Sequence, residues 1–194
     1  TPKVWLSASA SFNHFSNASF SLPNLGLNYP VIGAGLKYQW KNNIVDIQRD
    51  SIQKQKSLWQ WNLLFGLKEI NQPRNKKFIA LTGSFGRSIG LDKKRSLLLS
   101  ADVFNNTAHM ANETHGILFN TQLGLSVTYQ LHIDQVMLFL GAGAYVVDSY
   151  KSDGWLYNRG GIVYFFQEHL GVNLSIKAHK FKADYFELGL VHTF

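Results

Sequence analysis

The sequence predicts an all-β, antiparallel, transmembrane β-barrel of the outer-membrane type, with about ten strands in this chain. Apolar and polar residues alternate along most of the 194 residues, which is the period of a strand with two different faces. Many of these segments reach about ten residues, the length that a tilted strand needs to cross a membrane, whereas strands of soluble proteins average about five or six. Large aromatic residues also gather near the segment ends, as in interfacial girdles.

Alternation is clearest in 117–131, where Leu123, Leu125 and Val127 share one parity and polar residues or Gly fill the other. The ten expected strands are 3–15, 30–40, 58–69, 77–88, 96–105, 117–131, 135–147, 160–167, 171–180 and 184–194. We expect the apolar parity to face lipid and the other parity to face a polar interior. Residues expected to fill that interior are Lys37, Gln39, Gln60, Asn62, Lys68, Asn120 and Gln122.

The segment ends suggest an orientation. The chain ends on an apolar-alternating strand with Phe194, a terminal aromatic typical of outer-membrane barrels. With a periplasmic C-terminus, the connections near 132–134 and 168–170 are short periplasmic turns. The connections near 16–29, 106–116 and 148–159 are then long and extracellular, an asymmetry that such barrels share. The expected girdle residues are Trp5, Tyr38, Trp40, Trp59, Trp61, Tyr129, Tyr150, Trp155 and Tyr157.

Composition leaves a soluble lipocalin-like or sandwich β-protein as the alternative fold. The chain has no Cys, a net charge of +7 and no run of about 18 apolar residues such as a transmembrane helix needs. Its basic groups lie between apolar segments, so we expect anionic lipid headgroups, not nucleic acid, as their partner. No phosphate loop or dinucleotide fingerprint occurs, and we expect no cofactor. His109, Glu113 and His115 lie in a loop without a metal-binding framework, so no metal is expected.

One group of residues forms a candidate catalytic site. His14 and Ser16 are two residues apart and continue the apolar parity of the first strand, so both are expected to point into the bilayer. A polar pair is costly there unless it has a function. A neutral His can take the proton of a Ser hydroxyl and make it a nucleophile. Asn28 falls on the same face and can orient the His ring, and Asn17 with nearby backbone N–H groups can hold an oxyanion.

The run His14–Ala18, followed by Pro23–Leu27, resembles the signature of the lipid A 3-O-deacylase family (PagL) and its acyloxyacyl hydrolase-like relatives. The resemblance implies an integral protein of the bacterial outer membrane, with an eight-stranded barrel and an active site on its outer wall. It implies hydrolysis of an acyl ester of lipid A, in lipopolysaccharide or another outer-membrane lipid. The roles that it implies are general base for His14, nucleophile for Ser16, oxyanion contributors for Asn17 and the backbone of Ser19, and orienting residue for Asn28, which replaces the family's Glu.

The position of the motif implies the domain organisation. In the family the motif lies in the last two strands, but here it lies in the first two. We expect a motif-bearing strand pair at 1–40, a polar linker at 41–56 and an eight-stranded PagL-like barrel at 57–194, a diverged repeat in which His179 faces the lumen. Strands before Thr1 are then expected in a longer protein; otherwise 3–40 joins 57–194 in one ten-stranded wall, or the chain is part of a larger barrel.

Three functional classes stay open. The first is a lipid A esterase, the second a non-catalytic barrel that anchors or builds an envelope complex with protein partners, and the third a small pore. A pore is disfavoured because about ten strands enclose little space. Asp102 and Glu187 are expected in the lumen, paired with Arg87 or Lys177 in a structural network.

Overall fold

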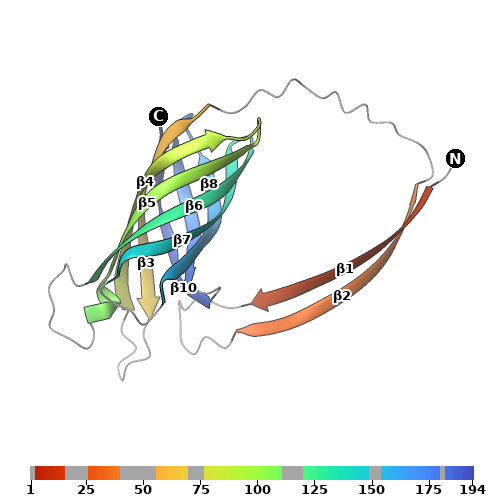
Figure 1. The fold of residues 1–194 in the computed structure, drawn as a ribbon, viewed down its shortest axis with the longest axis horizontal. Coiled ribbons are helices and arrows are strands. Elements are labelled where there is room, and N and C mark those ends of the chain that lie inside the picture. Colours follow the sequence, from red (N-terminus) through yellow and green to blue (C-terminus); the bar gives the residue numbers. More distant parts are fainter. Residues whose placement is uncertain are drawn as a thin grey trace.

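The computed structural model describes residues 3–15, 26–39, 56–69, 77–110, 120–148, 154–179 and 182–194. It contains a two-stranded antiparallel hairpin and a closed eight-stranded barrel, which lie apart in Figure 1. The strands are β1 Lys3–Phe15, β2 Leu27–Gln39, β3 Leu58–Glu69, β4 Lys77–Gly90, β5 Arg95–Asn106, β6 Thr121–Ile133, β7 Val136–Asp148, β8 Leu156–Phe165, β9 Leu170–His179 and β10 Lys182–Thr193. All ten expected strands are therefore present.

The barrel is closed by its first and last strands. Each of β3–β10 pairs antiparallel with its sequence neighbours, and β10 pairs with β3 from Phe186↔Leu67 to Thr193↔Gln60. Trp59 and Phe194 exchange two backbone hydrogen bonds, 2.8 and 2.9 Å long, at the end of this seam. Because the seam is complete, β1 and β2 do not join the wall, and the expectation of one ten-stranded wall is wrong.

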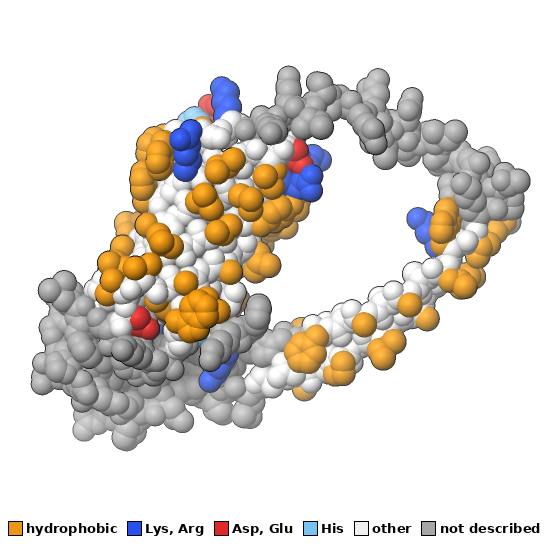
Figure 2. Space-filling view, in the orientation of Figure 1, with side chains coloured by type: hydrophobic (Ala, Val, Ile, Leu, Met, Phe, Trp, Pro, Cys, Tyr) orange, Lys and Arg blue, Asp and Glu red, His pale blue; other side chains and the backbone are white. Residues whose placement is uncertain are grey.

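The two faces of the barrel differ as the alternation predicts. Leu125, Val127 and Leu174 face outward with exposed fractions of 58%, 51% and 53%. Polar residues of the other parity are buried inside, among them Gln60, Asn62, Asn120 and Gln122. Figure 2 shows hydrophobic side chains spread over the visible outer wall and charged side chains near its ends. This is the arrangement of a transmembrane β-barrel, not that of a soluble sandwich with a dry core.

The connections at the two ends of the barrel differ in length. At the end that carries the C-terminus, short connections join the strands: 91–94, 134–135 and 166–169. At the other end the connections are 70–76, 107–120, 149–155 and 180–181, and the second of these includes the 3-10 helix η1, Thr107–Met110. The expected asymmetry is confirmed apart from 180–181, which is short. The described residues contain no helix long and apolar enough to cross a membrane.

Three strand starts and one girdle residue differ clearly from expectation. β2 begins at Leu27 instead of 30, β6 at Thr121 instead of 117, and β8 at Leu156 instead of 160. The earlier start of β8 turns Tyr157 inward, where it is 1% exposed, so its assignment to the aromatic girdle is wrong. Trp59 and Trp61 do point outward, near the end of the barrel that carries the C-terminus. Trp59 is stacked on Phe85, and Trp61 on His192. Trp40 and Tyr150 lie outside the described residues.

Candidate functional site

The hairpin β1–β2 has one apolar face. Its strands are paired along their whole length, from Lys3↔Gln39 to Phe15↔Leu27. Directly opposed residues of an antiparallel pair share a face, so every second pair can be read as one surface. On one face all pairs but the last are apolar: Val4↔Tyr38, Leu6↔Leu36, Ala8↔Ala34, Ala10↔Ile32 and Phe12↔Pro30. Leu6 and Ile32 are 84% and 88% exposed on it.

This apolar face ends at the candidate catalytic pair. His14, the last but one residue of β1, is the register partner of Asn28, the second residue of β2. The register thus brings together two of the candidate residues from the two sides of the connection 16–26. Because β2 begins three residues earlier than expected, Asn28 belongs to the strand and not to the loop. Ser16, Asn17 and Ser19 lie outside the described residues, and Ser16 directly follows the last residue of β1.

The opposite face of the hairpin is mixed: it is small and polar in its middle, and it exposes Trp5, Phe15, Tyr29 and Val31 toward its two ends. It carries Ser7, Ser9 and Ser11 across from Gly35, Gly33 and Val31, and the Lys37 ammonium lies 5.7 Å from the centre of the Trp5 ring. The hairpin therefore has one face that is apolar up to its last pair and one that is mixed. Among the described residues, its two outer edges have no strand partner. Two strands alone are marginally stable in water, and an open edge in a membrane is costly.

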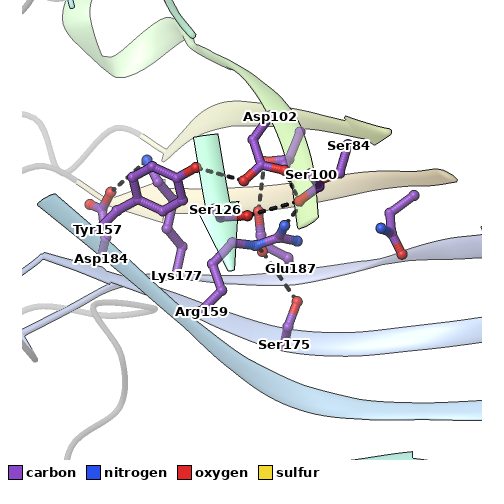
Figure 3. Close-up of polar contacts among 12 residues, drawn as sticks. Ser84, Ser100, Asp102, Ser126, Tyr157, Arg159, Ser175, Lys177, Asp184 and Glu187 are labelled. Atoms are coloured by element: carbon purple, nitrogen blue, oxygen red, sulfur yellow. Dashed lines mark hydrogen bonds and ion pairs between the residues drawn. The ribbon is translucent and has the colours of Figure 1, made fainter. Parts of the chain in front are cut away.

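A second polar cluster fills the barrel interior (Figure 3). At its centre, the Arg159 Nε donates to a carboxylate oxygen of Glu187 at 3.0 Å, and the Arg159 Nη1 donates to the Ser84 Oγ at 3.1 Å. The Glu187 carboxylate also accepts hydrogen bonds from Thr82 at 2.6 Å and Ser175 at 3.1 Å. Glu187 is completely buried. An ion pair with this many additional hydrogen bonds is what a buried charge needs in order to be tolerated.

Next to the ion pair, Asp102 accepts a hydrogen bond of 2.6 Å from the Tyr157 hydroxyl and one of 3.1 Å from Ser100. Ser100 in turn shares a 2.8 Å hydrogen bond with Ser126. The Tyr157 ring packs edge-on against Phe104, with 5.0 Å between ring centres. These contacts join β5, β6 and β8 through the interior.

Toward the end with the long connections, the Asp184 carboxylate lies among the side chains of Lys68, Lys177 and His179. It lies 2.5 Å from the Lys68 Nζ, 3.8 Å from the Lys177 Nζ and 3.5 Å from the His179 Nδ1. The Lys177 ammonium also lies 4.2 Å from the centre of the Phe104 ring. His179 faces the interior as expected, and its Nε2 is 2.7 Å from the Tyr145 hydroxyl. The network thus contains three carboxylates and three permanent cations: Asp102, Asp184, Glu187, Lys68, Lys177 and Arg159.

The interior network is a structural plug. Between Gln60, Thr128 and Arg159, in the middle of the barrel, one interior cavity measures about 20 Å³, which holds about one water molecule. A wider cavity of about 440 Å³, lined by Gln60, Ser88 and Gln130, lies at the short-turn end. A pore for larger solutes does not fit this interior. Asp102 and Glu187 do face the lumen, but their expected pairing with Arg87 or Lys177 is wrong, because Tyr157 and Arg159 take that place and Arg87 lies on the outer wall.

The sequence did not point to Arg159 because its strand was expected to begin at 160. The signal was weak because the outward positions 158 and 160 of β8 are Asn and Gly, so that strand lacks a clean apolar face. An earlier strand start would place Tyr157, Arg159 and Val163 on one inward parity. All three are buried.

The described part of the barrel does not repeat the hydrolytic motif. His192 faces outward, stacked on Trp61 and tilted against Phe194, with ring centres 5.8 Å from each. In the described barrel, no Ser lies two residues after an outward-facing His. Nor do the described residues contain a group of three His, Cys, Asp or Glu side chains that could hold a metal ion. Within the described part of the barrel there is thus no second set of candidate hydrolytic residues beside those of β1, β2 and their connection.

Comparison with known proteins gives a family and similar solved structures. The model of the acyloxyacyl hydrolase C-terminal domain (PagL_C) matches residues 57–194, which include all eight barrel strands. A structure described as "De novo design of transmembrane beta-barrels" is similar, with 11% identity, a TM-score of 0.46 and coverage of 74% of this chain and 100% of that chain. No curated protein matches. With most of its length matched by the family model, the chain belongs to the acyloxyacyl hydrolase (PagL-like) family.

Proposed function

We propose that this protein is an integral protein of the bacterial outer membrane that removes an acyl chain from lipid A. The single observation that carries the proposal is the His14–Asn28 register pair at the end of an apolar hairpin face, next to Ser16, in a chain of the acyloxyacyl hydrolase family. A soluble hydrolase places its site in a cleft. An enzyme whose substrate is a membrane lipid can place it on the lipid-facing wall.

In the proposed mechanism Ser16 is the nucleophile and His14 the general base. The Ser16 hydroxyl attacks the ester carbonyl of the lipid while His14 takes its proton. The tetrahedral intermediate collapses, the C–O bond to the sugar breaks, and protonated His14 returns the proton to the leaving hydroxyl. Water then hydrolyses the acyl-serine with His14 again as base, which releases a fatty acid. Asn17 and the backbone N–H of Ser19 stabilise the oxyanion.

Asn28 is the proposed orienting residue. An amide can hold an imidazole in one tautomer, as the Asn of Cys-His-Asn proteases does. It lacks the negative charge that would stabilise the imidazolium formed during the reaction. The exposed apolar face beside the pair, with Phe12 and Ile32, would let the acyl chain remain in contact with apolar surface throughout.

The proposed enzyme needs a complete wall around β1 and β2. The barrel of β3–β10 is closed and offers no free edge, so the partner strands of the hairpin come from outside 58–193. We propose that 1–40 is the motif-bearing part of one barrel wall, 41–56 a linker, and 57–194 a diverged barrel repeat that has kept the fold without the site.

The alternative is a non-catalytic barrel that serves as an anchor or as a subunit of an envelope complex with protein partners. Asn28 favours it, because an Asn in place of the family's Glu removes a charge from the proposed triad. The two functions differ in what the substitution of Ser16 changes.

The test compares lipid A from cells that produce the wild type, Ser16→Ala or Ser11→Ala. Ser11 lies on the opposite face of β1, across from Val31, and serves as the matched control. Mass spectrometry should show lipid A that lacks one acyl chain in wild-type and Ser11→Ala cells, and intact lipid A with Ser16→Ala. Identical acylation in all strains, with each protein folded and inserted, would support the non-catalytic alternative.

A further inference from the structure

An exposed cation lies on the outer wall of the barrel. Arg87 belongs to the outward parity of β4, between Phe85 and Ile89, and is three residues from the end of the strand at Gly90. Its guanidinium lies 5.7 Å from the centre of the Trp59 ring. Among the described residues it has no carboxylate partner, whereas Arg95, in the same region, is paired with Asp92. A charge near the end of a spanning strand, beside a girdle Trp, lies at headgroup depth.

An apolar groove begins at this cation. It has a volume of about 660 Å³ and crosses the outer wall from Trp59 and Arg87 toward Leu156. The surface is recessed here because small residues, including Ala101, Ala142 and Ala144, lie between larger side chains.

The register gives the direction of the groove. The residues Phe85, Ala101, Leu125, Ala144 and Leu156 are successive partners across β4–β8. Phe85 is five residues from the short-turn end of β4, whereas Leu156 is the first residue of β8, at the end with the long connections. The groove therefore runs diagonally across the outer wall, from the short-turn half of the barrel toward its other end. Four strand spacings make it about 20 Å long, enough for most of an extended fatty acyl chain.

We propose that this groove binds an anionic glycerophospholipid, with its phosphate at Arg87 and one acyl chain along the row of small residues. Charge complementarity and the continuity of cation and groove favour this occupant. Lys93 and Lys94, in the adjoining turn 91–94, add positive charge at the same surface. With the short turns on the periplasmic side, this surface is the one opposite to lipid A, so a glycerophospholipid is the expected occupant. The inference does not depend on the hydrolytic site of the hairpin.

The experiment measures lipid binding to the purified full chain by native mass spectrometry, with dipalmitoyl phosphatidylglycerol as the probe and the matching diacylglycerol as the uncharged control. Arg87→Gln should weaken phosphatidylglycerol binding about fivefold, the contribution of one basic residue at an anionic surface. Ala142→Leu, which fills the groove at a lipid-facing position, should weaken it comparably. Lys182→Gln removes the same charge from an exposed position at the other end of the barrel and should change nothing.

Equal loss of binding in Arg87→Gln and Lys182→Gln would overturn the proposal, because it would indicate general attraction to the basic protein. Equal binding of diacylglycerol and phosphatidylglycerol would contradict the proposal that Arg87 binds the lipid phosphate. Preferential binding of lipid A over phosphatidylglycerol at this groove would contradict the proposed occupant. Each variant is first checked for barrel folding by its heat-dependent mobility in gels.

Discussion

His14 and Asn28 are direct register partners, one residue from the point where the chain leaves β1 and one residue after it enters β2. In the proposed mechanism Asn28 is the residue that orients the His14 imidazole. Asn28→Glu should therefore raise ester hydrolysis, because a carboxylate stabilises the imidazolium and an amide does not. The measurement is the rate of fatty-acid release from lipid A in detergent micelles.

The control for this prediction is Asn13→Glu, which adds the same charge on the opposite face of β1, across from Tyr29. It should leave the rate unchanged. If the rate of Asn28→Glu equals that of the wild type, with the protein folded, Asn28 does not take part in the proposed site. A rise of the same size in both variants would indicate a general effect of charge on substrate binding.

Most of the fold could be predicted from the sequence because a membrane barrel repeats one simple rule. Residues such as Leu125 and Leu174 face lipid, and residues such as Gln122 face the interior. Apolar and polar residues therefore alternate along the strands with a period of two. The rule fails where outward positions are small or polar. β8 was expected four residues too late because Asn158 and Gly160 interrupt its apolar parity.

The partners inside the barrel could not be predicted from the alternation. Alternation says that Glu187 points inward, but not which strand faces it across the lumen. Arg159 reaches Glu187 from β8 although β9 lies between their strands, and Thr82 reaches it from β4 on the other side. Alternation does not show closure either, because the β10–β3 seam is set by the register of Val191 and Asn62, which are far apart in the chain. The eight-stranded unit at 57–194 was expected from the family resemblance.

The plugged interior predicts that the barrel does not conduct ions. Among the described residues, the space left by the Arg159–Glu187 network in the middle is about 20 Å³, too small for a hydrated ion. Residues 57–194, reconstituted in a planar bilayer, should show no discrete current steps, whereas a porin in the same bilayer should show them. Regular steps of constant size from the folded protein would contradict the structural role of the network.

Gly124 and Gly143 make room for the Tyr157 ring. A Cβ at Gly143 would lie 2.3 Å from the ring Cζ, and one at Gly124 would lie 2.6 Å from the Tyr157 hydroxyl oxygen. Gly143→Ala should push the ring from Asp102 and lower the free energy of unfolding by about 1–3 kcal/mol, the usual cost of overpacking. The measurement is urea unfolding in lipid vesicles, followed by Trp fluorescence. Gly83→Ala, where an added Cβ meets nothing within 4 Å, is the control and should cost less.

Loss of the Arg159–Glu187 ion pair is expected to lower the free energy of unfolding more than the other substitutions. Glu187→Leu leaves the buried guanidinium without its carboxylate and removes the acceptor of Thr82 and Ser175. Breaking a buried pair on one side typically lowers the free energy of unfolding by about 3–5 kcal/mol. Glu168→Leu, in the exposed turn 166–169, removes the same charge where the side chain is 89% exposed, and such surface changes usually stay within about 0.5 kcal/mol.

A double-mutant cycle separates the ion pair from the loss of packing. Arg159→Met should also destabilise the barrel, because it leaves Glu187 charged and buried with only hydroxyl donors. Adding Arg159→Met to Glu187→Leu removes the orphaned charge, so the double variant should be more stable than Glu187→Leu alone. Urea unfolding of the four proteins in lipid vesicles gives the coupling free energy. Additive effects of the two substitutions would mean that Arg159 and Glu187 do not stabilise each other, and the interior would then be held by its hydrogen bonds and apolar contacts alone.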